Sequence, residues 1–133
     1  MIVIDTSAIV AVLLKEPPAE ALAERLAGDR VRGMSTASYL ETGTVLAGRT
    51  PAAAQKTIDA LERFLIDMSI DLVPVDAEQA RLALRARIEY GRGFGAAAKL
   101  NFGDCFSYAL AKTLSAPLLY VGGDFDGTDV ARA

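Results

Sequence analysis

Four acidic residues stand where a folded domain would usually place an apolar or small side chain: Asp5, Glu41, Asp104 and Asp124. The chain contains no histidine, which excludes a Ser-His-Asp triad and a histidine general base. Several carboxylates without histidine suit a hard divalent cation that activates water. The residue types therefore predict metal-assisted chemistry on a phosphate-containing substrate.

Two of these acids follow apolar segments that are typical of parallel strands. Asp5 comes directly after residues 1–4, and Asp124 follows residues 118–121 after two glycines. Ligands of open α/β sheets bind at the carboxyl ends of the strands. We therefore expect Asp5 and Asp124 to leave the same edge of a sheet.

Asp5 and Glu41 also have structural explanations. Asp5 could cap the helix that follows it, although Thr6 and Ser7 stand closer to that helix and could cap it instead. Glu41 falls inside a predicted helix beside Leu40 and leans toward an apolar face. A buried glutamate is costly unless it is paired or bound to metal, whereas a solvated glutamate on a helix is ordinary.

Asp104 and Asp124 have equally plain alternatives. With Asn101 as an N-cap, Asp104 would be the third helical residue, where the helix dipole stabilises a carboxylate. Asp124 follows Gly122 and Gly123, which is a composition typical of turns. The functional interpretation of the four acids depends on their reaching one sheet edge together.

The hydrophobic pattern predicts alternating strands and helices. We expect strands at residues 1–4, 31–34, 72–75 and 117–121, and helices at 8–14, 18–27, 36–48, 50–68, 77–90 and 101–114. The helix at 50–68 should be the longest, and Pro74 favours an edge position or a strand end. Ser35 or Thr36, and Asp76, are expected N-caps. This order predicts a single three-layer α/β/α domain over residues 1–133, with a central parallel sheet.

Composition limits the environment of the protein. Hydrophobic residues make up 52% of 133 residues, but the longest apolar stretch, residues 8–14, is far shorter than the ~20 residues that span a bilayer. No secretory signal is apparent at residues 1–30. The single cysteine, Cys105, excludes an internal disulfide and favours a buried core residue over a catalytic thiolate. We expect a cytoplasmic protein without membrane contact.

The charge balance argues against a broad nucleic-acid-binding surface. The chain has 14 basic and 17 acidic residues, a net charge of −3. Five basic residues cluster near three glycines: Arg81, Arg85, Arg87, Arg92 and Lys99. This stretch is either a basic loop that holds a phosphate backbone or a solvated helix face running into a connector.

Four segments together resemble one known family. The segments MIVIDTSAIV, STASYLE, LNFGDCFSYALAK and PLLYVGGDFDGTDV resemble the PIN-domain ribonucleases, specifically the VapC toxins of bacterial toxin–antitoxin pairs. The resemblance covers nearly the whole chain in the right order. It implies an α/β/α PIN-like domain and a Mg²⁺- or Mn²⁺-dependent endoribonuclease.

The resemblance also implies roles for individual residues. Asp5 and Asp104 match the most direct metal ligands of the acidic quartet, which Glu41 and Asp124 complete directly or through water. Ser7 and Asn101 match polar residues that line the site in the family. Asp129 matches a further acidic position. One departure is Gly123, where the family usually carries asparagine or glutamate.

Partners and alternatives complete the hypothesis. The resemblance implies an RNA substrate, a VapB-like antitoxin and a homodimer, with residues 8–14 forming either one wall of the antitoxin groove or plain core. One alternative is a non-catalytic PIN-fold binding module. A metal-dependent phosphohydrolase is disfavoured, because one common pattern requires Asp-x-Asp and Asp5 is followed by Thr6 and Ser7.

Overall fold

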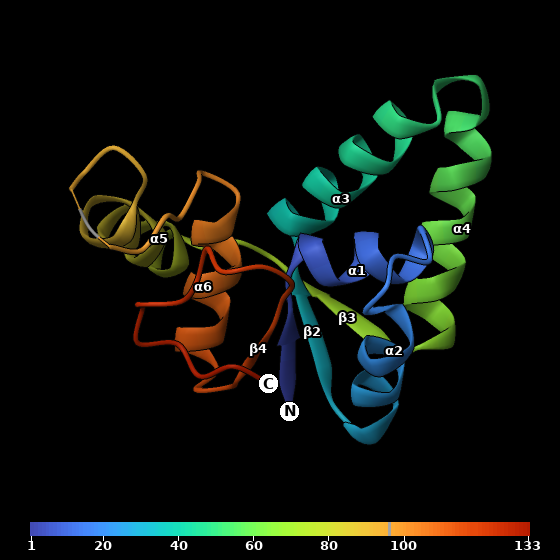
Figure 1. The fold of residues 1–133 in the computed structure, drawn as a ribbon. Helices are drawn as coiled ribbons and strands as arrows, with labels where there is room; N and C mark the ends of the chain where they lie inside the picture. The colour runs from blue at the N-terminus through green and yellow to red at the C-terminus, as the bar shows by residue number, and fades with distance from the viewer. Residues whose placement is uncertain (96) are drawn as a thin grey trace.

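The central element is a parallel sheet that runs through the middle of the molecule (Figure 1). The computed structural model describes residues 1–95 and 97–133. Within them the strands are β1 (Ile2–Ile4), β2 (Arg32–Ser35), β3 (Ile70–Val73) and β4 (Leu118–Leu119), in the order β3-β2-β1-β4. All three pairings are parallel, so the strands end at one common edge. The predicted parallel sheet is confirmed.

Helices cover both faces of the sheet, as the α/β/α prediction requires. They are α1 (Thr6–Leu13), α2 (Ala19–Gly28), α3 (Thr36–Arg49), α4 (Ala54–Asp67), α5 (Ala77–Tyr90) and α6 (Asp104–Thr113), with a short 3-10 turn at Pro51–Ala53. Figure 1 shows α1 to α4 on one side of the sheet and α5 and α6 on the other. Across the described residues, no helix is both long and apolar enough to pass through a bilayer.

Strand β1 shows how the sequence produces two separate cores. Ile2 and Ile4 pack with α1 to α4, whereas Val3 packs with α5 and α6. Successive side chains of a strand point to opposite faces, so three consecutive apolar residues supply both layers. All three are fully buried. This is the reason for the uninterrupted apolar opening of the chain.

Several predicted boundaries hold and others shift. Ser35 and Asp76 cap α3 and α5, each accepting a hydrogen bond from a backbone N–H of the first turn. β3 is an edge strand, as Pro74 indicates. The predicted longest helix is wrong, because a 3-10 turn takes its first residues and α4 has 14 residues, as do α3 and α5. The last strand is shorter than predicted and ends at Leu119.

The hydrophobic pattern of residues 77–90 predicts an inner face made of Ala80, Leu82, Ala83 and Ile88, and this prediction is partly wrong for α5. Ala83 is buried as expected, but Ala80 is exposed and the side chain of Ile88 is 56% exposed. Gln79 and Ala86 take the buried positions instead. Cys105 is a buried core residue, as predicted, and burial raises the pKa of its thiol to about 11.

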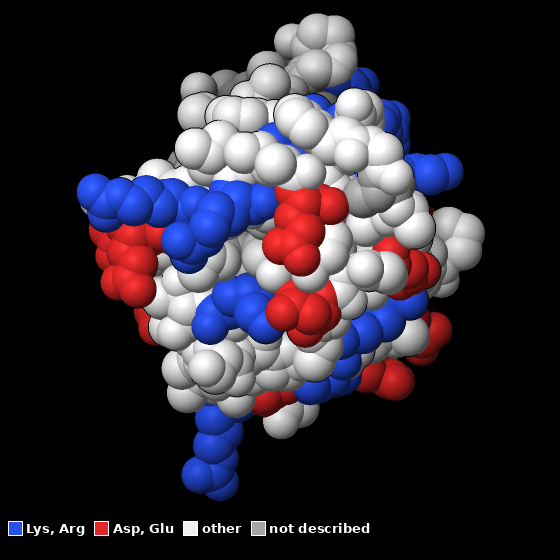
Figure 2. Space-filling model, turned by 90° about the vertical axis from the view of Figure 1, so that its left-hand side faces the viewer, with Lys and Arg blue, Asp and Glu red and all other residues white. Residues whose placement is uncertain are grey.

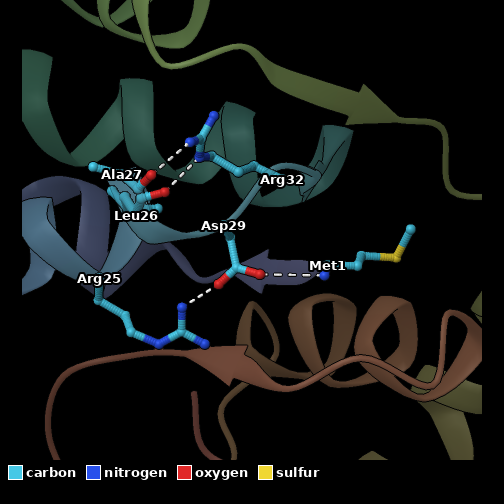
Figure 3. Close-up of polar contacts among 6 residues, drawn as sticks. All are labelled: Met1, Arg25, Leu26, Ala27, Asp29 and Arg32. Carbon is cyan, nitrogen blue, oxygen red and sulfur yellow. Dashed lines mark hydrogen bonds and ion pairs between the residues drawn. The ribbon is translucent and has the colours of Figure 1, made fainter.

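Ionic contacts hold the turn that leads into β2, at the amino ends of the strands. Asp29 accepts hydrogen bonds from Arg25 and from the amino group of Met1, the latter at 3.2 Å (Figure 3). Arg32 donates to the carbonyl oxygens of Leu26 and Ala27, which lie in the last turn of α2. These contacts satisfy helix-end carbonyls that have no intrahelical partner.

Candidate active site

The four predicted acids line one pocket at the carboxyl edge of the sheet. The pocket has a volume of about 250 Å³. Asp5 follows β1, Glu41 lies in α3, Asp104 begins α6 and Asp124 follows β4. The other lining residues are Thr6, Ser7, Val10, Glu16, Val45, Arg49, Asn101 and Val121. Segments more than a hundred residues apart in sequence thus supply one acidic site.

Asp5 both caps α1 and lines the pocket. Its Oδ2 accepts hydrogen bonds from the backbone N–H of Ser7 at 2.9 Å and from Ser7 Oγ at 2.6 Å. Of the three caps that the sequence allows for this helix, Asp5 is the one observed, and Thr6 and Ser7 do not cap it. Its Oδ1 is buried and has no hydrogen-bond partner among the described residues. Such an oxygen is costly, and a cation would satisfy it.

Glu41 turns into the pocket rather than toward solvent. The hydroxyl of Thr6 donates to Glu41 Oε2 at 2.8 Å. The backbone of Gly103 lies so close that an added Cβ would overlap the Glu41 carboxylate. Burial raises the pKa of Glu41, and the charge of Asp5 raises it further against the opposing Thr6 hydrogen bond. The carboxylate is thus held in place by one hydroxyl and by the absence of a side chain at Gly103.

Asp104 and Asn101 hold each other through a reciprocal pair of hydrogen bonds. The N–H of Asp104 donates to Asn101 Oδ1, and the N–H of Asn101 donates to Asp104 Oδ2, both at 2.8 Å. α6 begins at Asp104, so Asp104 is the first helical residue and not the third, as predicted. Burial raises the pKa of Asp104 to about 7, with added repulsion from Asp5, Asp124 and Glu41. Bringing positive charge to the pocket would relieve this repulsion.

The two C-terminal acids have different surroundings. Asp124 lines the acidic pocket, and its carbonyl oxygen accepts a hydrogen bond from the N–H of Lys99 at 3.3 Å. Asp129 lines a different pocket and accepts hydrogen bonds from the Tyr108 hydroxyl at 2.6 Å and Lys112 Nζ at 2.8 Å. The structure therefore does not bring Asp129 to the acidic pocket. Its contacts tie the C-terminal segment to α6.

The chemistry of the pocket fits a hard divalent cation. Carboxylate oxygens are the donors that Mg²⁺ prefers, and Asp5 Oδ1 is a buried oxygen that lacks a partner. Within residues 1–95 and 97–133, no three acidic or cysteine side chains already converge as a ready-made ligand set. Hydrogen bonds to Ser7, Thr6 and Asn101 hold the carboxylates in their present positions.

The basic stretch near α5 lies outside the pocket lining. Arg87 donates to the carbonyl oxygens of Arg92 and Leu100 and lies over the ring of Phe94, so it organises the connector. Arg81 and Arg85 lie on the exposed face of α5. Figure 2 looks onto this side and shows basic and acidic side chains intermixed. Within this stretch, residue 96 lies outside the described residues.

Comparison with known proteins identifies the family. The family model described as PIN domain matches residues 2–131. The chain belongs to the PIN domain family. Among curated PIN-domain relatives, a "Ribonuclease VapC" of Mycolicibacterium smegmatis is 51% identical over 129 residues, which cover 97% of each chain. "Ribonuclease VapC28" of Mycobacterium tuberculosis is 46% identical over 131 residues, covering 98% of this chain and 96% of the relative.

Solved PIN-domain structures share the fold at low sequence identity. The crystal structure of the toxin VapC20 of Mycobacterium tuberculosis matches with a TM-score of 0.79 at 17% identity, covering 100% of this chain and 98% of the other. A toxin–antitoxin complex from Klebsiella pneumoniae matches with a TM-score of 0.72 at 16% identity, covering 100% and 97%. The predicted PIN-like fold class is confirmed.

The sequence does not single out every residue that shapes this pocket. It predicts Thr6 only as a helix cap, and it predicts no role for Arg49, which lines the pocket, or for Gly103, which lies against the Glu41 carboxylate beside it. Arg49 had a readable signal, because Glu41, Val45 and Arg49 recur at four-residue steps and so share one face of a helix. Gly103 had no readable signal, because the neighbour that requires it, Glu41, is remote in sequence.

Proposed function

We propose that this PIN domain is a divalent-metal-dependent endoribonuclease of the VapC type that hydrolyses RNA phosphodiester bonds at the acidic pocket. The observation that carries the proposal is the convergence of Asp5, Glu41, Asp104 and Asp124 on one pocket, with Asp5 Oδ1 buried and unpartnered among the described residues. Relatives that are 46–51% identical over nearly the whole chain are named ribonucleases. This argues against a phosphohydrolase or a binding module that only retains the fold.

The protein's own residues orient the acids. Ser7 fixes one oxygen of Asp5, Thr6 fixes one oxygen of Glu41, and the Asn101 N–H fixes one oxygen of Asp104. In each carboxylate the second oxygen remains for a ligand. A bound Mg²⁺ or Mn²⁺ would activate water and neutralise charge on the phosphate. In-line attack by that water would leave a 3′-hydroxyl and a 5′-phosphate.

The test is cleavage of end-labelled tRNA and ribosomal RNA fragments by the purified chain with Mg²⁺ or Mn²⁺, beside EDTA. We expect discrete cuts that need metal and fall at least about a hundredfold in Asp5→Asn, because losing one electrostatic stabiliser typically costs on the order of 10²–10³ in rate. Asp67→Asn, at an exposed position in α4, is the matched control and should cleave normally. Products ending in a 2′,3′-cyclic phosphate would contradict hydrolysis by water.

The proposal includes a partner that masks the site. A structural neighbour of this fold is a toxin–antitoxin complex, which supports a VapB-like antitoxin for this chain. Residues 8–11 of α1 are buried and pack in the core, so they would contribute little to an antitoxin groove. Co-expression with a VapB-like antitoxin should yield a complex with suppressed cleavage, and full activity of that complex would contradict inhibition.

A homodimer and a cytoplasmic location belong to the same proposal. Leu40 and Phe102, which are 68% and 74% exposed, flank an apolar groove of about 540 Å³ beside the acidic pocket. A second copy would cover such a surface. Size-exclusion chromatography with light scattering should show a dimer that Leu40→Glu dissociates, and a monomer at micromolar concentration would contradict it. The unpaired Cys105 agrees with a reducing compartment.

A further inference from the structure

The acidic pocket continues as a groove between α1 and α3, beyond the four acids. Glu41, Val45 and Arg49 stand at successive four-residue steps of α3 and all line it. Thr6 and Val10 line it from α1. With about 1.5 Å of rise per residue, Glu41 and Arg49 are about 12 Å apart along the helix axis. The groove thus has an acidic end, an apolar middle and a far end at Arg49.

Arg49 is paired across the far end of the groove. Its Nη1 donates to Glu16 Oε1 at 3.2 Å, which joins the end of α3 to the segment after α1. The Arg49 side chain is 55% exposed and the Glu16 side chain 36% exposed. An ion pair with this much solvent contact contributes little to stability. The guanidinium can therefore exchange Glu16 for a better anion at small cost.

Charge and geometry indicate what that anion is. Within the described part of the chain, Arg49 is the one basic side chain that lines the pocket, against five carboxylates. If one phosphodiester of a nucleic-acid strand lies at Asp5 and Asp104, the nucleotides on either side of it must contact other parts of the same pocket. A guanidinium can bind a phosphate through two parallel hydrogen bonds. A phosphate is therefore at least as good a partner for Arg49 as the partly exposed carboxylate of Glu16.

We propose that Arg49 holds the RNA strand by a phosphodiester next to the scissile one, and that Glu16 keeps the guanidinium extended across the groove until the phosphate replaces Glu16. This inference rests on the proposed ribonuclease activity and adds a substrate-positioning residue to it. Arg49 acts on the strand by charge and hydrogen bonding, and the acids act on the scissile bond.

The two partners of the pair should respond in opposite directions. Arg49→Ala should raise the KM for RNA on the order of tenfold with little change in kcat, since it removes an interaction common to ground and transition states. RNA binding by this variant should also depend less on salt. The slope of log K for RNA against log salt should become shallower by about 0.7, the value for one lost phosphate contact on a single strand. Arg49→Lys should restore that slope. Glu16→Gln should lower KM, because it removes a competing carboxylate.

The experiment pairs cleavage with binding. Arg63→Ala, at an exposed position of α4, removes the same charge away from the pocket and should change neither KM nor slope. Binding of a fluorescein-labelled 20-nucleotide single-stranded RNA of mixed sequence is measured with Mg²⁺ in an Asp5→Asn background, with and without Arg49→Ala. Loss of affinity with the flattened slope supports the inference, even if the wild type cleaves nothing and the ribonuclease proposal fails.

Two results would overturn the inference while leaving the ribonuclease proposal intact. In one, Arg49→Ala cleaves and binds as Arg63→Ala does. In the other, Glu16→Gln and Arg49→Ala both lower the melting temperature and leave RNA affinity and its salt slope unchanged. That pattern would show that the pair only ties α3 to α1.

Discussion

Ser7 donates its hydroxyl hydrogen to Asp5 Oδ2 at 2.6 Å and accepts the N–H of Val121 at 3.0 Å, so one side chain links the ends of β1 and β4 at the acidic pocket. The hydroxyl thereby orients Asp5 and leaves its buried Oδ1 without a hydrogen-bond partner among the described residues.

Ser7→Ala should therefore weaken metal binding without unfolding the protein. Groups that orient a metal ligand typically contribute about 10–100-fold to affinity, and we expect a loss in this range for Mn²⁺ measured by isothermal titration calorimetry. Thr113→Ala removes an exposed hydroxyl in α6 and is the control. Unchanged Mn²⁺ affinity in Ser7→Ala would show that Asp5 needs no such orientation.

Asp104→Asn should stabilise the metal-free protein at neutral and higher pH. Burial and the neighbouring carboxylates raise the pKa of Asp104 to about 7, above its usual 3.8. Because its pKa is raised on folding, Asp104 contributes fully to the free energy of unfolding below its pKa in the unfolded chain, and this contribution is lost as the pH rises through 7. The variant escapes this loss and should gain about 1–2 kcal/mol at pH 8, less than the shift alone implies because the charges relax.

The check is chemical denaturation of both proteins in EDTA from pH 4 to pH 8. The difference in unfolding free energy should widen as the pH rises. Added Mg²⁺ should then stabilise the wild type more than the variant, because a ligand stabilises only the state that binds it. A variant that is less stable than the wild type at pH 8 would show that repulsion in the pocket is already relieved.

Gly103→Ala should damage the site through Glu41. The added Cβ would overlap the Glu41 carboxylate, so Glu41 must move away from Thr6, and overpacking of this kind typically costs about 1–3 kcal/mol. We expect a lower melting temperature together with weaker Mn²⁺ binding. Calorimetry and a thermal melt measure both.

Gly48→Ala is the matched control for that substitution. Gly48 lies in α3 and an added Cβ there meets nothing within 4 Å. Alanine at an unobstructed helical glycine usually stabilises by about 0.5–1 kcal/mol. If the two alanine variants melt alike, the close approach at Gly103 is not a constraint on Glu41.

Asp29→Asn should destabilise the protein at neutral pH only slightly. The Arg25 guanidinium and the Met1 amino group lower the pKa of Asp29, with the Arg25 contact the larger cause. A lowered carboxyl pKa gives stability that is present above the unfolded value of 3.8 and is lost as pH falls through the folded value. Because these partners are solvent-exposed, we expect a melting temperature about 1–2 °C lower at pH 7.

That small difference should begin to shrink as the pH falls below the unfolded value of 3.8, and it should vanish once the pH is below the lowered pKa of Asp29, where the wild-type carboxylate is also protonated. Differential scanning calorimetry at intervals from pH 7 down to about pH 2 makes the comparison. A difference that does not shrink over this range would assign the effect to packing at the turn instead of charge.

Features that depend on neighbouring residues could be predicted from the amino-acid sequence. Ser35 and Asp76 were readable as helix caps because a cap bonds to N–H groups two or three residues away. The alternation of strands and helices, and hence the parallel sheet that gathers the acids, followed from the local hydrophobic pattern. The resemblance of four ordered segments supplied the family and the identity of the acids.

Contacts between residues remote in sequence could be seen only in the folded structure. Ser7 meets Val121 across 114 positions, Thr6 meets Glu41 across 35, and Arg49 meets Glu16 across 33. The exposure of Ile88 and the separation of Asp129 from the pocket follow from such packing. A periodic pattern shows which face of its own helix or strand a side chain lies on. The residue that it contacts depends on which other element packs against that face in the folded protein.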